Sequence, residues 1–392
     1  MITDEVLARL DASSPQARGL PNDAFISEAF LDLERERLFP RSWVFTAPAS
    51  SLSHVGDVKC VDVAGHPLIL VKGEDDQVRA FHNVCPHRGA RLVTENTAKC
   101  VTMTCPYHAG SYDLKSRLKG RPHYHGPSAH DVAGDSEVCL FEVRTGVWHD
   151  WLFVNLDGKA MPFEDYIAPV ISEFGGYDVS AYGRSDLEMA FEFRCNWELA
   201  FENFCDFYHV FKLHPALDEM MASDAASRRA MWPNGPHIFN GYQFTGAGGG
   251  IALGDKTAEL PSAANLSGKN ANGLVYAGLF PNAAVVVLPG NLEVVLFEPV
   301  AVDRTIMRLW FYFVGDAATS AKQAANRRQL HDEWLALNKE DESICARLQQ
   351  GRTCTAYDGG RIAPYWDTGT IHYHRQVAHA IRGEEYFVAS AG

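Results

Sequence analysis

Two short cysteine–histidine pairs are the residues of this chain whose types and spacing most directly suggest chemistry. Cys85 and His87 lie in "CPHRG", and Cys105 and His108 lie in "CPYHAGSYDL", with seventeen residues between the two pairs. Thiolate and imidazole side chains are ligands for zinc and for iron. Each pair lies where a β-hairpin turn could present two side chains toward one point. The four residues therefore form a candidate Cys2His2 metal site.

Two metal groups suit a Cys2His2 set of ligands. One is structural zinc, which is tetrahedral and redox-silent, and the other is a [2Fe–2S] cluster with two cysteines on one iron and two histidines on the other. A proline follows each cysteine, and Gly89 and Gly110 flank the two loops. Stiffened loops in a β-rich setting, without a histidine-bearing zinc-finger helix, favour the cluster, although the spacing alone does not decide.

The segments "CPHRGARL" and "CPYHAGSYDL" resemble the cluster-binding motif of Rieske proteins, in the form used by ring-hydroxylating-type oxygenases. The resemblance implies that Cys85, His87, Cys105 and His108 bind a [2Fe–2S] Rieske cluster. A cluster alone would also fit an electron-transfer protein without oxygenase activity. A second site therefore has to decide whether the chain is an enzyme.

The segment "NWELAFENFCDFYHVFKLHP", residues 196–215, carries the next candidate ligands. Aromatic residues recur along it at helical spacing and predict a helix over about 197–212. His209 and His214 are five residues apart, which is ~140° around an ideal helix. The two imidazoles can therefore reach one metal only if the helix widens or ends there, and Pro215 is placed to end it.

A carboxylate that could complete this set lies in a later helix, which is predicted over about 319–350. Asp341 falls on the apolar stripe of that helix, which comprises Leu330, Trp334, Leu337, Ile344 and Leu348. A buried carboxylate is costly unless it is paired or bound to a metal, and an arginine partner or a loop cap is the alternative. With the two histidines, Asp341 would form a two-His-one-carboxylate triad, which binds non-haem Fe(II) and leaves positions open for O2.

A second resemblance rests on these segments. "ENFCDFYHVFKLHP" and "EDESICARLQQG" are similar to the mononuclear-iron segments of Rieske oxygenase α subunits, and the likeness extends over nearly the whole chain. It implies that His209, His214 and Asp341 are the iron ligands and that Asn203 lies close to the iron. It also implies that Asp206 links an iron-ligand histidine to a Rieske histidine of a neighbouring subunit.

The resemblance and the pattern of elements together give an expected fold of the α+β class. Short β-rich runs predict an all-β Rieske [2Fe–2S] domain over 43–157. Residues 165–392 are expected to form an α+β catalytic domain with an antiparallel sheet and helices that carry the mononuclear iron ligands. Residues 1–42 are expected to be a helical segment that packs with the catalytic domain.

The supply of electrons is expected to lie on another chain. The sequence has no flavin or dinucleotide fingerprint, and its "GAGGG" stretch lacks the strand-to-helix setting of G-x-G-x-x-G. The resemblance implies that NAD(P)H is oxidised by a separate flavin or iron–sulfur reductase, often with a ferredoxin. It also implies a ring-shaped homotrimer, because the cluster and the iron of one subunit are expected to lie too far apart for efficient electron transfer.

The substrate is suggested only by resemblance. The stretch "GLFPNAAVVVLPGNLEVVLFEP" looks most like the branch that hydroxylates or N-demethylates quaternary ammonium compounds such as glycine betaine, carnitine or stachydrine. Such a cation calls for an aromatic pocket, and the candidates are Tyr242, Tyr276, Phe280 and Trp310, although aromatic residues in strands are more often core. The alternative is an aromatic-acid ring hydroxylase or O-demethylase, and the choice between monooxygenase and dioxygenase stays open.

Length and composition set the remaining bounds. The chain has 392 residues, which predicts two domains. A net charge of −14 argues against general binding to nucleic acid or to an anionic membrane, and no apolar run approaches the ~20 residues that span a bilayer. No signal peptide is visible, and the nine irregularly spaced cysteines indicate thiols and metal ligands. We therefore expect a cytoplasmic protein that acts on a small molecule.

Overall fold

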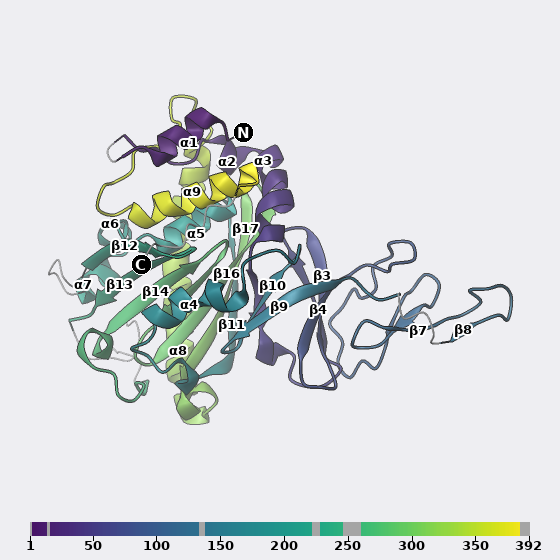
Figure 1. Cartoon of the computed structure of the whole chain (residues 1–392). Helices are drawn as coiled ribbons and strands as arrows, with labels where there is room; N and C mark the ends of the chain where they lie inside the picture. The colour runs from purple at the N-terminus through teal and green to yellow at the C-terminus, as the bar shows by residue number, and fades with distance from the viewer. Residues whose placement is uncertain (1, 14–15, 133–137, 222–227, 246–259, 385–392) are drawn as a thin grey trace. The chain divides into compact units, whose positions relative to one another are not determined.

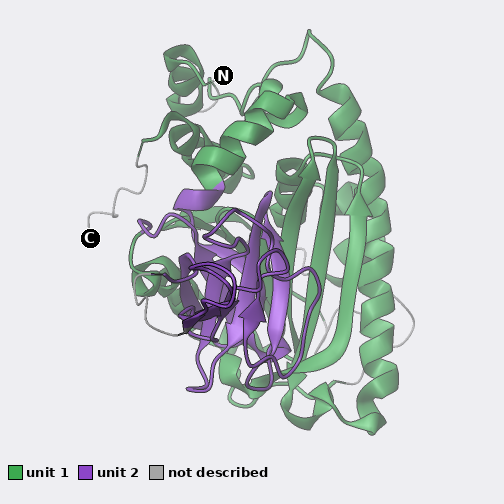
Figure 2. Cartoon of the chain, turned by 90° about the vertical axis from the view of Figure 1, so that its right-hand side faces the viewer, with its two compact units in different colours: residues 1–38, 161–392 green, residues 39–160 purple. Residues whose placement is uncertain are grey.

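The computed structural model describes the chain except for residues 1, 14–15, 133–137, 222–227, 246–259 and 385–392 (Figure 1). The "GAGGG" stretch lies outside the described residues. The chain forms two compact units, of which unit 2 is Phe39–Ala160 and unit 1 combines Met1–Leu38 with Met161–Gly392 (Figure 2). Unit 2 is thus inserted into the sequence of unit 1. Among the helices that the structure describes, none is both long and apolar enough to cross a membrane.

Unit 2 is built from two antiparallel sheets. The larger has the strand order β1-β10-β9-β4-β3-β2, and the smaller has the order β5-β6-β7-β8. The strands are β1 Val44–Pro48, β2 Val58–Val63, β3 His66–Lys72, β4 Val78–His82, β5 Met103–Thr104, β6 Ser111–Tyr112, β7 Leu118–Arg121, β8 Asp131–Val132, β9 Glu142–Trp148 and β10 Trp151–Asn155. Cys85 and Cys105 belong to the same buried cluster as Ile69, Phe81 and Met103. The two thiols therefore lie at the edge of the hydrophobic core and not in free loops.

Unit 1 contains a seven-stranded antiparallel sheet with the order β11-β17-β16-β15-β14-β13-β12. The strands are β11 Tyr182–Phe193, β12 Arg228–Asn234, β13 His237–Gln243, β14 Gly273–Leu279, β15 Ala283–Val287, β16 Asn291–Ala301 and β17 Arg304–Val314. Every residue of β14 and β15 is buried. Because side chains alternate between the faces of a strand, both faces of the sheet centre are covered. This explains why the sequence there is a continuous apolar run without alternation.

The helices of unit 1 are α1 Asp4–Asp11, α2 Asp23–Ile26, α3 Glu28–Leu33, the π-helical turn η1 Glu34–Leu38, α4 Phe163–Glu173, α5 Trp197–Cys205, α6 Val210–Leu213, α7 Pro215–Met220, α8 Ala324–Gly351 and α9 Thr368–Arg382. Of these, α5, α8 and α9 contact the sheet, and α1 lies on α9 (Figure 1). Helices α5 and α8 pack against each other and lie on the same face of the sheet. Phe201 on α5 meets Phe297 of β16, and Trp334 on α8 hydrogen-bonds Glu293 of the same strand. Phe297 and Glu293 are four residues apart and therefore point to one face.

The predicted helix over 197–212 is wrong, because α5 ends at Cys205. Asp206 has an extended backbone with φ −78° and ψ 134°. Its carboxylate accepts hydrogen bonds from the backbone N–H groups of Tyr208 at 2.7 Å and His209 at 3.3 Å. An aspartate that bonds the backbone just beyond itself competes with the helix and starts a turn. The interruption of the helix that brings the two histidines together therefore begins at Asp206, well before Pro215.

Two carboxyl groups are fully buried where α5 meets η1. Glu34 and Glu198 both have zero exposure, and the indole N–H of Trp197 donates to Glu34 at 3.1 Å. Burial raises the pKa of Glu34 to about 7 and raises the pKa of Glu198 well above its usual value, and the neighbouring Glu34 carboxyl raises the pKa of Glu198 further. Both carboxylate oxygens of Glu198 and the Oε1 of Glu34 have no hydrogen-bond partner among the described residues. A shared proton is the arrangement that suits two acids in one apolar place.

The Glu198→Gln variant should lose less stability than the parent protein as the pH rises. Both carboxyls have raised pKa values in the folded state, so the stability they contribute is complete at low pH and is lost as the pH rises through about 7 and above. For each proton that the folded protein holds and the unfolded chain has released, the free energy of unfolding falls by roughly 1.4 kcal/mol per pH unit. We expect the difference in free energy of unfolding between the two proteins to grow between pH 6 and pH 9 in urea titrations. Glu36→Gln, at an exposed position of the same turn, is the control, and parallel pH profiles of Glu198→Gln and the parent would contradict the prediction.

Candidate metal centres

The two cysteine–histidine loops of unit 2 have the same backbone geometry. In each, the cysteine N–H donates to the carbonyl five residues later, from Cys85 to Ala90 at 2.7 Å and from Cys105 to Gly110 at 2.8 Å. In each, the cysteine carbonyl also accepts from the N–H of the fourth residue beyond it, at 2.9 and 3.0 Å. That fourth residue has a left-handed φ in both loops, 73° in one and 55° in the other. The two loops therefore have equivalent backbone structures, which suits two loops that bind one metal cluster from either side.

The four candidate cluster ligands form a cysteine pair and a histidine pair on these two loops. Cys85 and Cys105 are both buried, and the neighbouring Cys85 side chain contributes to the lowered pKa of Cys105. The imidazoles of His87 and His108 are exposed, with ring centroids 4.7 Å apart. Burial raises the pKa of Cys105, but backbone N–H groups lower it by more, so that the net shift favours the thiolate. A cysteine side facing the core and a histidine side facing outward fit a [2Fe–2S] group with different ligands on its two irons.

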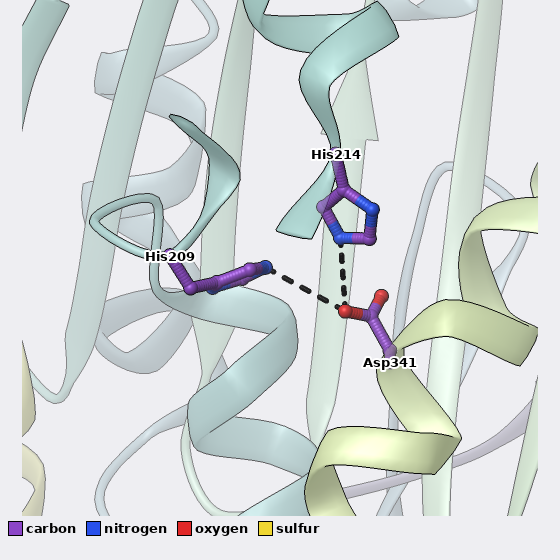
Figure 3. Close-up of side chains that lie close together, drawn as sticks. All are labelled: His209, His214 and Asp341. Atoms are coloured by element: carbon purple, nitrogen blue, oxygen red, sulfur yellow. Dashed lines mark hydrogen bonds and ion pairs between the residues drawn. The ribbon is translucent and has the colours of Figure 1, made fainter. Parts of the chain in front are cut away.

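His209, His214 and Asp341 converge in unit 1 and point toward one another (Figure 3). Their ligand atoms all lie within 4.8 Å of one another. Asp341 Oδ1 is 2.9 Å from His214 Nε2 and 3.6 Å from His209 Nε2. His209 precedes α6 and His214 follows it, and this helix has only four residues. Because the chain turns at each end of so short a helix, two histidines five residues apart face the same point.

Two further carboxylates hold the outer nitrogens of these imidazoles. Asp206 Oδ2 is 3.1 Å from His209 Nδ1, and Glu340 Oε2 is 2.6 Å from His214 Nδ1. A carboxylate that accepts the Nδ1–H of a histidine leaves its Nε2 lone pair for a metal. Burial lowers the pKa of His214, but Asp341 and Glu340 raise it by more, so positive charge is favoured at this point. The donor set therefore fits a divalent cation bound between the three side chains.

Glu340 is a site residue that the sequence did not reveal. It is next to Asp341 in α8, and adjacent helical residues point ~100° apart. Asp341 was singled out because it falls on the buried stripe, whereas Glu340 lies on the exposed side of the helix. Its proximity to His214 depends on how the turn between α6 and α7 lies against α8 in three dimensions. No local pattern in "NKEDES" carries that information.

Glu340→Ala should weaken iron binding by about 10- to 100-fold, which is the usual cost of losing a carboxylate behind a metal-bound histidine. The reason is that His214 loses the acceptor that fixes its ring and tautomer. The measurement is a competition titration of Fe(II) against a chelator without oxygen. Glu342→Ala is the matched control, because Glu342 is on the same helix but pairs with Arg194 at 2.6 Å. An unchanged dissociation constant in Glu340→Ala would exclude the orienting role.

A cavity of about 40 Å³ adjoins the three converging side chains. Its wall includes both histidines and Asp341, and the other residues that matter here are Asn203, Phe204, Phe207, Tyr276 and Trp334. Phe204 lies 5.2 Å from Tyr276 and 6.0 Å from Trp334, measured between ring centroids. The space beside the triad is thus enclosed by aromatic rings together with aliphatic side chains.

Of the four aromatic residues proposed from sequence, one lines this cavity, one packs behind its wall and two lie elsewhere. Tyr276 lines it, and Tyr242 packs behind Phe207, with ring centroids 4.2 Å apart. Phe280 and Trp310 are not among the described residues of its wall. Phe280 packs on Tyr373 at 5.8 Å, and the Trp310 indole N–H donates to Glu188 at 3.2 Å. Asn203 and Asp206, also proposed from sequence, both line the cavity.

Comparisons with known proteins identify the family. A sequence model described as "Ring hydroxylating alpha subunit (catalytic domain)" matches residues 179–383, and a model described as "Rieske [2Fe-2S] domain" matches residues 42–132. The chain belongs to the ring-hydroxylating α-subunit family. This Rieske oxygenase resembles the carnitine monooxygenase oxygenase subunit of Escherichia coli (strain K12), with 27% identity over 97% of this chain and 98% of the relative.

Two other comparisons agree with this family. The glycine betaine monooxygenase oxygenase subunit of Pseudomonas aeruginosa is 20% identical, over 90% of this chain and 87% of the relative. The solved structure of the quaternary ammonium Rieske monooxygenase CntA, in complex with an inhibitor, superposes with a TM-score of 0.76 at 20% identity. That match covers 96% of this chain and 98% of the solved chain. The expected α+β fold, with a Rieske domain before a catalytic domain, is confirmed.

Membership of the family fixes the class of chemistry. The Rieske oxygenase is an iron-dependent enzyme that carries a [2Fe–2S] cluster and a mononuclear iron. It acts as an oxygenase component on a small molecule and O2, with a separate reductase. The expectations of an enzyme and of these two cofactors are confirmed, and an electron carrier without oxygenase activity is excluded.

Proposed function

We propose that this Rieske oxygenase oxidises a quaternary ammonium compound, with Cys85, His87, Cys105 and His108 as ligands of the cluster. The observation that carries the substrate class is the wall of the cavity. Its described residues include four aromatic rings and the carboxylates of Asp206 and Asp341, and no lysine or arginine. An aromatic and acidic enclosure attracts a desolvated cation. The named relatives, which act on carnitine and on glycine betaine, support the same class.

The roles of the site residues follow from their contacts. His209, His214 and Asp341 would hold the mononuclear iron, which activates O2 when it is bound. Asp206 keeps the Nε2 of His209 directed at the metal, and Glu340 does the same for His214. Phe204, Tyr276 and Trp334 bind the apolar methyl groups of a substrate and exclude water. The protein therefore positions reactants and leaves the oxidation itself to the metal.

The electron path is proposed to run between subunits of a homotrimer, from NAD(P)H through a separate reductase. The surface beside Asp206 supports this proposal. Tyr208 and Phe211 are 46% and 58% exposed, and Trp366 stacks on Tyr208 at 5.5 Å. Exposed aromatic residues in one place mark a contact surface. A Rieske loop of the partner subunit would cover it and bring its histidines to Asp206. If native mass measurement shows that a preparation with normal turnover is monomeric, the trimer is refuted.

A substrate screen with O2 and a surrogate reductase tests the proposed class. Glycine betaine, carnitine, γ-butyrobetaine and stachydrine form one panel, and benzoates with ring hydroxyl or methoxy groups form the other. We expect a betaine to be consumed with coupled oxygen uptake. Turnover of an aromatic acid without turnover of any betaine would favour the alternative, a ring hydroxylase or O-demethylase. Both panels carry a carboxylate, so they differ in the quaternary ammonium group, which the aromatic and acidic wall of the described cavity suits.

A further inference from the structure

A buried acid lies directly behind the cavity wall. Glu293 on β16 has zero exposure. Its Oε1 accepts the indole N–H of Trp334 at 3.2 Å and a hydrogen bond from the Asn291 amide. Its Oε2 has no hydrogen-bond partner among the described residues. Trp334 lies on α8, two turns before Asp341, and lines the cavity. The carboxyl is therefore connected to the cavity through a single indole ring.

The neighbours of Glu293 provide no counter-charge. Burial raises the pKa of Glu293 to about 8, and the hydrogen bonds from Asn291 and Trp334 only partly offset this. The described titratable groups that interact with it are Tyr182 on β11 and Tyr276 on β14, and neither carries a positive charge. No described lysine, arginine or histidine acts on its pKa. A buried carboxyl without an internal cation is costly, and an external cation would remove that cost.

The aromatic rings around Trp334 form a box that suits such a cation. Tyr276, Val286 and Glu293 are aligned across β14, β15 and β16 and therefore lie on the same face of the sheet. Phe204 of α5 is near both Tyr276 and Trp334, with an angle of 24° to the indole. A helix, a second helix and a strand thus each contribute one ring. Quaternary ammonium groups bind in enclosures of this kind, and tryptophan is the strongest contributor.

We propose that Trp334 and Glu293 form the cation-recognition element of the cavity. The indole face receives the trimethylammonium group, and the carboxylate behind it supplies the counter-charge through the indole N–H. This inference rests on the proposed substrate class. Glu293 is a positioning residue and not a catalytic one, because it acts through Trp334. Since the bound cation favours the ionised carboxylate, binding should expel a proton whenever the free protein holds Glu293 protonated.

Glu293→Gln separates a charge effect from a purely structural one. Glutamine keeps an oxygen that can accept the indole N–H but carries no charge. The probes are glycine betaine and γ-butyrobetaine, each paired with the tert-butyl analogue in which carbon replaces the nitrogen. Binding is measured by calorimetry on the iron-loaded protein without oxygen. We expect the preference for the betaine over its neutral analogue to fall about tenfold in Glu293→Gln, a change equivalent to about 1.4 kcal/mol.

Proton release is the second readout, and a structural role for Glu293 would not produce it. Titrations in two buffers of different ionisation enthalpy at pH 7 should show proton release on betaine binding in the parent protein and little in Glu293→Gln. The affinity of the parent should rise from pH 7 toward pH 9, because the free-protein pKa is about 8. Trp334→Phe, which keeps a ring but lacks the N–H, should bind betaine with less proton release.

The matched control is Glu188→Gln. Glu188 accepts the indole N–H of Trp310 at 3.2 Å, the same contact in the same sheet but away from the described cavity wall. It should keep the preference and the proton release of the parent. If Glu293→Gln keeps both as well, the inference is overturned while the proposed substrate class stands. If the parent protein binds neither betaine, both are overturned.

Discussion

Replacing Asp341 by alanine should remove the mononuclear iron and reduce turnover to background, while the visible spectrum of the Rieske cluster stays unchanged. Asp341 is the only carboxylate of the described metal-ligand group and lies within 3.6 Å of both imidazoles. Without it two neutral imidazoles remain, which hold Fe(II) weakly. The cluster ligands are in unit 2 and Asp341 is in unit 1. Iron analysis should therefore fall from about three to about two atoms per chain.

Asp332→Ala is the control for this experiment, because Asp332 lies on the same helix and its side chain is exposed. It should keep the full iron content and normal turnover. Normal turnover in Asp341→Ala would contradict the proposed ligand set, and loss of the cluster spectrum would point to general unfolding. The two readouts together separate loss of a ligand from loss of the fold.

Replacing Asp206 by asparagine should slow electron delivery by about 100-fold and leave both metal centres occupied. The structure gives Asp206 two tasks, because its carboxylate starts the turn after α5 and also contacts His209 Nδ1. Asparagine forms the same kind of turn, so the fold and His209 should keep their places. What it lacks is the charge that would join His209 to His108 of the partner subunit. Single-turnover reduction kinetics measure this step.

The Asp206→Ala variant distinguishes the two tasks of Asp206. Alanine cannot form the turn, so we expect loss of iron as well as loss of electron delivery. An acid that served only as a scaffold would give a different pattern, in which the asparagine variant loses iron and transfers electrons normally in the fraction that remains loaded. Normal single-turnover rates in Asp206→Asn would refute the bridging role.

Features of the fold and of the site could be predicted from the sequence where one continuous segment contains all the residues that form them. The loops around Cys85 and Cys105 each carry their ligands, their proline and their turn, so the likeness of the two loops could be predicted from the residues alone. The strand at Ala283–Val287 is uniformly apolar, and the sheet it predicts is present. Asp341 was found because a carboxylate on a buried helical stripe is conspicuous, and it is indeed buried at 8% exposure.

Other features depend on contacts between distant segments. Aromatic periodicity continues through Tyr208 and Phe211, so it concealed the end of the helix at Cys205. The break results from side-chain hydrogen bonds of Asp206, which compete with helical ones and leave no mark on periodicity. Leu348 was assigned to the buried stripe of α8 but is 41% exposed. The contact between Trp334 and Glu293 joins residues 41 positions apart.

The insertion of unit 2 into the sequence of unit 1 determines the order in which the chain can fold as it is synthesised. Unit 2 is one continuous stretch that ends at Ala160, so all of its contacts are available once that stretch has left the ribosome. The first 38 residues have to wait for partners made much later. Arg37 donates to the carbonyl of Ile381, and Arg9 pairs with Asp358. A nascent chain can therefore carry a completed Rieske unit while its catalytic unit is still unfinished. A polypeptide truncated before α9 would leave α1 and η1 without the helix on which they pack.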